Sequence, residues 1–532
     1  MANSNSTKEP FNFPWFPKSW NLTVGFQVII TLLVAGVIGY GIYFFSSNSD
    51  KLGGGNSSSK TDVTILVNNF VGFAPPLSLF DKGMEATKDS RLYKEFGITA
   101  KMIEFKTDQE FFAALQSGEG DVMFVTTDIF PIKMEVGGDF TKIGVEEFLK
   151  LNDSRGADVF VVDKTINTIA DLRGKTVACA LGWPGNTLLH KTLEAGGLTA
   201  SVYGSPGDVN VSDSQDPEEA IKAFKSGNVD AIVVWSPDDI DCIESRKGAK
   251  VLTSTETMPH IIMDGLIAKH EIIEKKKDKL VALAKAWLTA NAEMSDPQKM
   301  KSAAKAFQEA FGSTQDVETL IGMMKTVHFA TYGDNKDFFG LSTDFSGTTG
   351  QTLYTSMAKV YKNGYGNNFK EILPWPQVSN ASIIQAITGL DGEIHQSEKQ
   401  ITFAAIDETS AAKAIAVASK RVSVNFEVNS SLLSQIERNK IRREVGETAL
   451  NLEGFRIRIE GNTDSTGSRE LNIRLSKARA DAVKEYLVKE YGFDPHRIIT
   501  IGNGPDKPIA DNGTEAGRAE NRNTAFDFIP AK

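Results

Sequence analysis

The sequence predicts an α/β protein of two lobes, preceded by one apolar helix and followed by a small α+β domain. Three observations support this prediction. From residue 61 onward, short apolar runs alternate with helical patterns in two successive series, which is typical of two mostly parallel sheets. After residue 420 the predicted order is strand, helix, strand, helix, strand, which describes a small α+β domain. Near the N-terminus, residues 22–45 contain no charged side chain.

The composition is that of a folded, acidic protein. With 532 residues, of which 41% are hydrophobic and 24% charged, the chain has enough apolar material for two or three domains. The formal net charge of −10 argues against a nucleic-acid-binding surface, because such a surface needs a basic stripe. The two cysteines, Cys179 and Cys242, belong to no metal-type cluster, so we expect two buried thiols.

The N-terminal part predicts a membrane anchor. A helix over residues 22–45 would be about 36 Å long, which is enough to cross a bilayer. The run ends in aromatic residues and lacks a small-residue cleavage site, which favours an uncleaved anchor over a removed signal peptide. The flanking charges favour a cytoplasmic N-terminus. Residues 1–21 are then a cytoplasmic leader, and residues 46–60 are a flexible Gly/Ser/Asn-rich linker.

The two lobes are expected within residues 61–400. The predicted strands include Val63–Val67, Ala100–Phe105 and Val122–Val125 in the first series, and Thr176–Ala180 and Ala231–Trp235 in the second. Because ligands of open α/β sheets bind at the carboxyl ends of the strands, the residues that follow these strands are candidates for a binding site.

Four segments of this region resemble periplasmic binding proteins of the nitrate, sulfonate, taurine and thiamine-precursor type. They are Asp121–Asp128, Ile169–Val177, Gly182–Thr187 and Ala223–Pro237, and the resemblance extends over about residues 61–341. It implies a two-lobed periplasmic-binding-protein fold with a small anionic or polar solute between the lobes. The expected solute-binding residues are Thr126, Thr127, Trp183, Asn186, Thr187 and Trp235. Hydroxyls and the amides of a helix start would donate to the solute, and the tryptophans would form aromatic walls.

Two alternatives stay open in this region. The tryptophans are equally well explained as core residues, and the threonines as turn formers. Residues 343–400 either complete the first lobe or form a separate interaction surface. Residues 401–420 are expected to be an alanine-rich linker.

The last region, residues 421–532, predicts a small α+β domain that begins with a strand at Val422–Val428. A long helix is expected to start at Arg469 with Ser468 as its N-cap. Helical spacing places Asn472, Ser476 and Arg479 on one face. Leu471, Leu475, Ala478 and Ala482 form the adjacent apolar stripe, which we expect to face the core.

A carboxylate lies close to this helix in sequence. Because Asp464 is in the loop that enters the helix, its side chain and the Arg479 guanidinium can face one small volume. Such a pair suits a zwitterion, since the carboxylate accepts from an ammonium group while the guanidinium donates two parallel hydrogen bonds to a carboxylate. From spacing alone, a structural salt bridge between Asp464 and Arg479 is an equal alternative.

The segment Gly461–Gly467, with Asn472, Leu475–Ser476 and Arg479–Ala480, closely resembles the motif of OmpA-like peptidoglycan-binding domains, and Asn521–Arg522 continue the match. The resemblance implies binding of the diaminopimelate side chain of peptidoglycan. It assigns Asp464 and Arg479 as the principal contacts, supported by Thr463, Asn472, Asn429 and Arg522. Two residues depart from the family pattern: Asn462 replaces a His or Tyr, and Asn523 replaces an Arg.

No catalytic residue, metal or cofactor is expected, because the six histidines are scattered and the motifs HExxH, GxSxG and Walker A do not occur. The predicted function is that of a single-pass inner-membrane protein whose periplasmic part binds peptidoglycan and a small solute. One alternative is a wall-anchored stator-like or scaffold subunit, with its N-terminal helix against a membrane-protein partner. Another is the substrate receptor of an ABC importer.

Overall fold

The computed structural model describes residues 61–202, 205–214, 217–345, 347–365, 370–399, 401–426 and 430–531, which contain three β-sheets. The apolar stretch at residues 22–45, its leader and its linker lie outside the described residues. Among the residues that are described, no helix combines the length and the apolar character that crossing a membrane requires.

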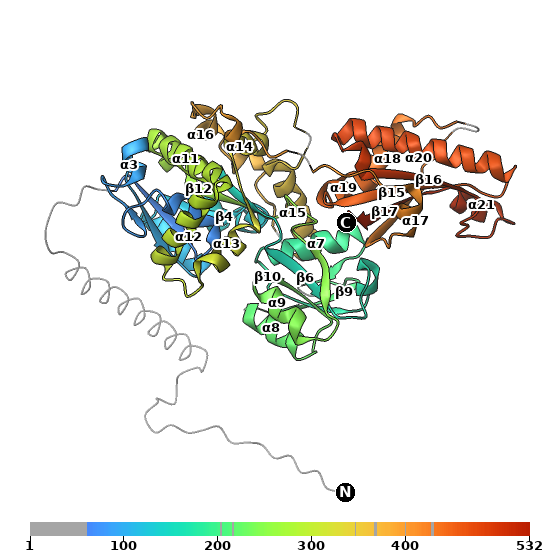
Figure 1. Cartoon of the computed structure of the whole chain (residues 1–532), viewed down its shortest axis with the longest axis horizontal. Helices are drawn as coiled ribbons and strands as arrows, with labels where there is room; N and C mark the ends of the chain where they lie inside the picture. Colours follow the sequence, from blue (N-terminus) through green and yellow to red (C-terminus); the bar gives the residue numbers. More distant parts are fainter. Residues whose placement is uncertain are drawn as a thin grey trace, which may run out of the picture. The chain divides into compact units, whose positions relative to one another are not determined.

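The first sheet has seven strands in the order β13-β5-β12-β4-β1-β3-β2. Its central strands β12 and β4 are labelled in Figure 1. Strand β1 is parallel to β3 and β4, whereas β12 runs antiparallel between β4 and β5. The strands are β1 (Val63–Val67), β2 (Glu85–Ala86), β3 (Ala100–Glu104), β4 (Val122–Thr126), β5 (Val145–Ser154), β12 (Met263–Lys269) and β13 (Val327–Phe329). The predicted strands at Val63–Val67 and Ala100–Phe105 are confirmed to within one residue, and so is the strand at Val122–Val125.

Helices cover both faces of this sheet. On one face, a core that includes Trp287 is formed with α2 (Ala74–Leu77), α3 (Arg91–Phe96), α11 (Lys277–Ala292), α12 (Pro297–Phe311), α13 (Val317–Met324) and α16 (Ser382–Ala386). On the other, a core that includes Tyr354 is formed with α4 (Asp108–Ser117), α5 (Phe130–Lys133), α6 (Asp139–Ile143) and α15 (Gly350–Tyr365). The remaining elements of this lobe are η1 (Val71–Phe73), α10 (His270–Lys275), η3 (Glu293–Ser295), α14 (Tyr332–Phe338), η5 (Trp375–Gln377) and η6 (Glu393–His395).

The segment after residue 343 completes the first lobe. Trp375 is buried in the core around Tyr354, and Ile383 and Ile384 are buried in the core around Trp287. Of the two alternatives that the sequence left open for residues 343–400, the structure therefore favours completion of the lobe.

The second sheet has six strands in the order β11-β6-β10-β7-β9-β8. They are β6 (Asp158–Val162), β7 (Thr176–Cys179), β8 (Ala200–Ser201), β9 (Val209–Asp213), β10 (Ala231–Trp235) and β11 (Lys250–Ser254). Its helices are η2 (Ile169–Leu172), α7 (Gly185–Ala195), α8 (Pro217–Lys225) and α9 (Asp238–Ser245). Cys179 and Cys242 are free and buried, as predicted. The chain enters this sheet between β5 and β6 and leaves it between β11 and β12, so two crossings join the lobes.

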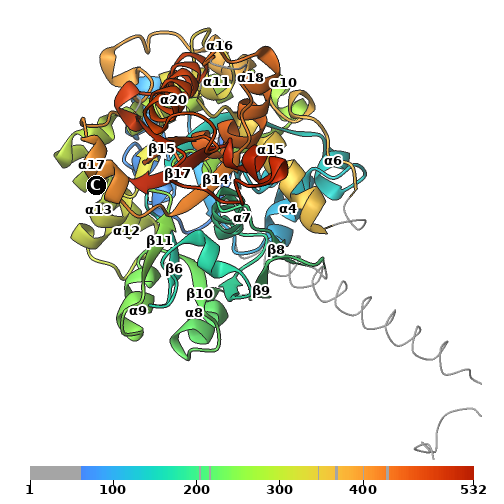
Figure 2. The same ribbon diagram turned by 90° about the vertical axis from the view of Figure 1, so that its right-hand side faces the viewer.

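The third sheet has the order β14-β17-β15-β16, with α20 packed along β15 and β16 (Figure 2). The strands are β14 (Ala418–Val422), β15 (Phe455–Asn462), β16 (Ile498–Gly504) and β17 (Thr524–Pro530). The helices are α17 (Glu408–Lys413), α18 (Gln435–Ile441), the π-helical turn η7 (Arg442–Gly446), α19 (Glu447–Asn451), α20 (Arg469–Tyr491), η8 (Pro495–Arg497) and α21 (Glu515–Asn521).

Among the described residues of the strand predicted at Val422–Val428, which are residues 422–426, only Val422 belongs to a strand, so the prediction is wrong for residues 423–426. Strand β14 ends where Val422 pairs with Thr524, and Thr524 is the first residue of the partner strand β17. Residues after Val422 therefore have no neighbouring strand to bond with on that side.

The apolar stripe predicted for α20 is also wrong in part. Leu471 is 47% exposed, whereas Asn472 and Ser476 are buried. The reason is the close approach of the helix to the sheet: a Cβ added at Gly461 would lie 2.2 Å from the carbonyl oxygen of Ser476. Where backbones touch in this way, small residues form the contact face. Ser476 lies on this contact face, where its Oγ accepts a hydrogen bond from the backbone amide of Gly504 at 2.9 Å.

Residues 401–420, which we expect to form a linker, make specific contacts with the third sheet. The Arg458 guanidinium donates to the carbonyl oxygens of Ala411 at 2.8 Å and Ala414 at 3.0 Å. The amide of Phe403 donates to Asp494 at 2.8 Å. Within the described residues, this segment is packed against the C-terminal domain.

Candidate ligand-binding sites

Asp464 is held in a charged state in the loop between β15 and α20. Its Oδ2 accepts from Nη1 of Arg522 at 2.6 Å, and its Oδ1 accepts from the amide of Thr466 at 2.8 Å. Burial acts to raise the pKa of Asp464, but these hydrogen bonds outweigh it and lower the pKa below its usual value. The carboxylate therefore stays ionised at neutral pH.

Arg479 projects from α20 into the same neighbourhood. Its Nε donates to the carbonyl oxygen of Ser430 at 3.2 Å, and its guanidinium lies over the ring of Phe426 at 4.9 Å. Burial and the nearby charge of Arg522 lower the pKa of Arg479, and the charge of Asp464 opposes that shift. The structure pairs Asp464 with Arg522 rather than with Arg479, so the alternative of a plain Asp464–Arg479 salt bridge is wrong.

The supporting residues mainly shape the loop. Thr463 Oγ1 donates to the carbonyl of Asp464 at 2.9 Å, and Asn472 Nδ2 donates to the carbonyl of Thr466 at 2.9 Å. Asn429 lies outside the described residues. The sequence reasoning missed the partner of Asp464, although Arg522 was on the candidate list, because the two residues are 58 positions apart.

The two departures from the family pattern contact each other. Asn462 Nδ2 donates to Asn523 Oδ1 at 3.1 Å, and the Asn462 amide donates to the Asn523 carbonyl at 3.0 Å. Both side chains are buried. The Asn462 Nδ2 group thus satisfies the Asn523 Oδ1 atom, and Asp464 and Arg522 are in contact in the presence of this pair.

A second candidate site lies where the two lobes meet. Thr127 Oγ1 donates to Glu147 Oε1 at 2.7 Å, and Thr187 Oγ1 donates to Asp128 Oδ2 at 2.6 Å. The latter bond joins the end of β4 to the first turn of α7, and thus one lobe to the other. Both hydroxyls are fully buried, so the donors that the sequence assigned to a solute are directed to carboxylates.

The other predicted solute contacts lie around these threonines. Thr126 ends β4 opposite Asp264 of β12. Asn186 precedes Thr187 and is 1% exposed, yet neither polar atom of its side chain has a hydrogen-bond partner among the residues that the structure describes. The sequence reasoning did not select Asp128, Glu147 or Asp264, because they come from three separate strands or strand ends.

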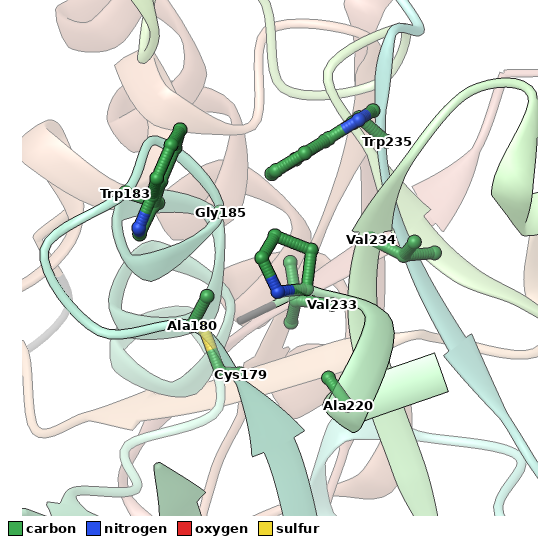
Figure 3. A pocket seen from close by; sticks show the side chains of 9 residues that line it. Cys179, Ala180, Trp183, Gly185, Ala220, Val233, Val234 and Trp235 are labelled. Atoms are coloured by element: carbon green, nitrogen blue, oxygen red, sulfur yellow. The ribbon is translucent and has the colours of Figure 1, made fainter. Parts of the chain in front are cut away.

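Trp183 and Trp235 face each other at the carboxyl ends of β7 and β10 (Figure 3). Their ring centroids are 5.9 Å apart at an interplanar angle of 36°. The space that they line with Val233 and Ala220 has a volume of about 10 Å³, which is room for about one water molecule. In this conformation the tryptophans pack mainly against each other, and Trp183 remains 40% exposed.

Comparison with known proteins identifies two segments. Residues 59–308 match the NMT1-like family, and residues 425–522 match the OmpA family. Outer membrane protein Omp38 of Acinetobacter baumannii is 46% identical over 99 residues, which are 19% of this chain and 28% of that protein. Peptidoglycan-binding protein ArfA of Mycobacterium bovis is 49% identical over 67 residues, which are 13% of this chain and 20% of that protein.

Among solved structures, the periplasmic aliphatic sulphonate-binding protein SsuA of Escherichia coli covers 62% of this chain and 100% of its own, with 17% identity and a TM-score of 0.45. The chain spans less than two thirds of the length of the curated relatives that it matches. The chain therefore combines an NMT1-like, solute-binding type of domain with a C-terminal OmpA domain.

Proposed function

We propose that this protein binds peptidoglycan through its C-terminal domain, with Asp464 and Arg479 as the contacts for the diaminopimelate side chain. The observation that carries the proposal is the half-buried Arg479 guanidinium beside an ionised carboxylate. Arg479 would take the ligand carboxylate, and Asp464 would take its ammonium group. The OmpA family match and the similarity to a peptidoglycan-binding protein support the assignment.

Both domains are of types found in the cell envelope, which supports a periplasmic location for residues 61–532. We further propose that residues 22–45 anchor the protein in the inner membrane, with residues 1–21 in the cytoplasm and residues 46–60 as the tether. In this arrangement the chain connects the membrane to the cell wall.

Co-sedimentation with purified sacculi tests the wall-binding proposal. We expect the full-length protein to pellet with sacculi that contain diaminopimelate, and free meso-diaminopimelate to release it. Cadaverine is the matched competitor, because it has the same carbon chain between its two amino groups but neither carboxylate that Arg479 would take, and it should release far less protein. A protein that stays in the supernatant with sacculi would contradict the proposal.

For the middle domain we propose that it binds a small polar solute at the junction of the two lobes. The NMT1-like match supports this function, and so does the cluster of buried polar groups around Asp128 and Asn186. A solute that bound only the folded state would raise the melting temperature of the domain.

A thermal-shift experiment on the full-length protein tests this second proposal. The panel contains sulfonates, nitrate, bicarbonate and phosphate as anions, pyrimidines as neutral solutes, and amines as cations. At least one class is expected to raise the midpoint of unfolding of the middle domain. If every class leaves the midpoint unchanged, the domain acts as a scaffold in a wall-anchored complex, and the solute-binding proposal is wrong.

A further inference from the structure

Seven buried polar atoms at the lobe junction have no hydrogen-bond partner in the described structure. They are Asn68 Oδ1, Asp128 Oδ1, Glu147 Oε2, both side-chain polar atoms of Asn152 and both of Asn186. In folded proteins nearly all buried polar atoms are paired with protein groups, ligands or ordered water, so a cluster of unpaired ones marks a place that water or a ligand occupies. Five of these seven atoms are oxygens, and all five accept hydrogen bonds when the carboxyl groups of Asp128 and Glu147 are ionised, so a partner that stabilises the ionised form must donate.

These atoms belong to one place in the fold. Asn68 follows β1, and Asp128 follows the adjacent strand β4. Asn152 pairs across the ladder with Asp264, whose other partner is Thr126 at the end of β4. Thr127, which directly follows β4, is hydrogen-bonded to Glu147. Thr187, next to Asn186 in the first turn of α7, is hydrogen-bonded to Asp128, which also follows β4. Asp158 of β6 accepts from Ser154 Oγ at 2.7 Å, and its charge acts on the carboxyl groups of Asp128 and Asp264. We call the seven residues Asn68, Asp128, Glu147, Asn152, Asp158, Asn186 and Asp264 the junction cluster.

The junction cluster is strongly acidic. Its four carboxyl groups, those of Asp128, Glu147, Asp158 and Asp264, are each at least 94% buried, and none of them has a cationic partner within 4.0 Å among the described residues. The neighbouring cation Lys150 is instead paired with Asp153 at 2.8 Å. The cluster therefore lacks a positive charge of its own to balance its acids.

Burying these carboxyl groups together raises their pKa values, because burial and the neighbouring carboxylates disfavour the ionised form. Burial raises the pKa of Asp128 and of Glu147 to about 8 and that of Asp158 to about 6. Burial, together with the charges of Asp128 and Asp158, raises the pKa of Asp264 well above its usual value. A bound cation would lower these pKa values again, because it stabilises the ionised carboxylates.

We propose that the junction cluster binds a small organic cation bearing a protonated amino or guanidino group, a substrate class that rests on the proposed solute-binding function. The argument is the match of charge and hydrogen bonding: ammonium and guanidinium groups only donate, and the cluster mainly accepts. An anion bound at the junction cluster would lie beside four carboxyl groups with no paired cation, and their repulsion would disfavour its binding. The polar solute expected from the sequence is thus assigned a positive charge.

Thermal shift and calorimetry on the full-length protein test the proposal with putrescine and agmatine as probes. The matched controls are 1,4-butanediol, which has the length of putrescine without its charges, and ethanesulfonate. At constant ionic strength we expect saturating putrescine to raise the unfolding midpoint of the middle domain by about 5 °C. We expect no rise with either control.

Isosteric variants locate the bound cation. Asp264→Asn and Asp128→Asn each remove a carboxyl group that a bound cation would hold in its ionised form, without changing the size of the side chain, and each is expected to weaken putrescine binding at least tenfold. Asp139→Asn is the control, because Asp139 lies on the exposed surface of α6 in the same lobe, and its affinity should stay within twofold of the wild type.

The outcomes separate this inference from the function on which it rests. If sulfonates or neutral pyrimidines bind and the amines do not, the domain binds a solute but the cationic class is wrong. An unchanged putrescine affinity in Asp264→Asn would likewise overturn the assignment to the junction cluster. If no compound of any class binds, the solute-binding proposal fails as well.

Discussion

The variant Arg479→Ala should lose at least about 30-fold in affinity for sacculi, which corresponds to about 2 kcal/mol. The lost group is a half-buried guanidinium that no other described side chain replaces at this position, since Arg522 is engaged with Asp464 and Glu515. Without Arg479, the ligand carboxylate would be desolvated against Asp464 with no charge to balance it. The measurement is co-sedimentation of the full-length protein over a series of sacculus concentrations.

Arg474→Ala is the matched control for this prediction. Arg474 lies on the same helix and is exposed to solvent, so its removal changes the net charge equally and should leave binding within twofold. Asp464→Ala should resemble Arg479→Ala, because it removes the contact for the ammonium group. Wild-type sedimentation of Arg479→Ala, with an unchanged circular dichroism spectrum, would exclude Arg479 as a ligand contact.

The second large effect is expected from Arg497→Ala, which should destabilise the C-terminal domain by about 3–5 kcal/mol. Arg497 is 1% exposed and donates to three backbone carbonyls, those of Phe455 at 2.9 Å, Ala449 at 2.6 Å and Leu452 at 2.8 Å. Two of these carbonyls close the end of α19 and the third begins β15. Alanine would remove the guanidinium donor from all three carbonyls, of which, in the described structure, only that of Leu452 keeps a second donor, the amide of Phe455 at 2.9 Å.

Hydrogen exchange of the full-length protein measures this effect within the domain concerned. The amides of β15 and β16 should exchange at least about 100-fold faster in Arg497→Ala, because their exchange requires opening of the domain. Arg497→Met should be almost as unstable, since it restores volume but no donor. Arg443→Ala, at a 71% exposed arginine, is the control that should leave exchange unchanged. Slow exchange in both Arg497 variants would show that the three carbonyls find other donors.

Local sequence patterns were sufficient for most of the fold. Each predicted strand of the two lobes is an apolar run bounded by turn residues, and a buried strand needs that pattern wherever it lies in the sheet. The start of α20 was predictable for the same reason, because the Ser468 side chain caps the helix by accepting from the amide of Leu471. The buried face of α20 was not, because Gly461 and Gly502 allow the helix to touch the sheet with small and polar residues.

In the candidate sites too, the sequence predicted the residues but not their contacts. The residues of the wall-binding motif were found from their spacing, but the partner of Asp464 was not, because two guanidinium groups lie within reach of it and only the folded loop selects Arg522. For the lobe junction, the sequence indicated the strand ends and the threonines. It did not indicate that Glu147 and Asp128 would accept the hydroxyl protons expected for a solute.

By itself, the sequence determined the classes of the domains, their order along the chain and the motif at the proposed ligand contacts of the OmpA domain, because apolar periodicity, caps and fixed motif spacings act over short stretches of chain. Only the tertiary structure decided that residues 343–400 complete the first lobe and that four carboxyl groups gather where the lobes meet. These features depend on contacts between residues tens to hundreds of positions apart, and such contacts leave no periodic pattern in the sequence.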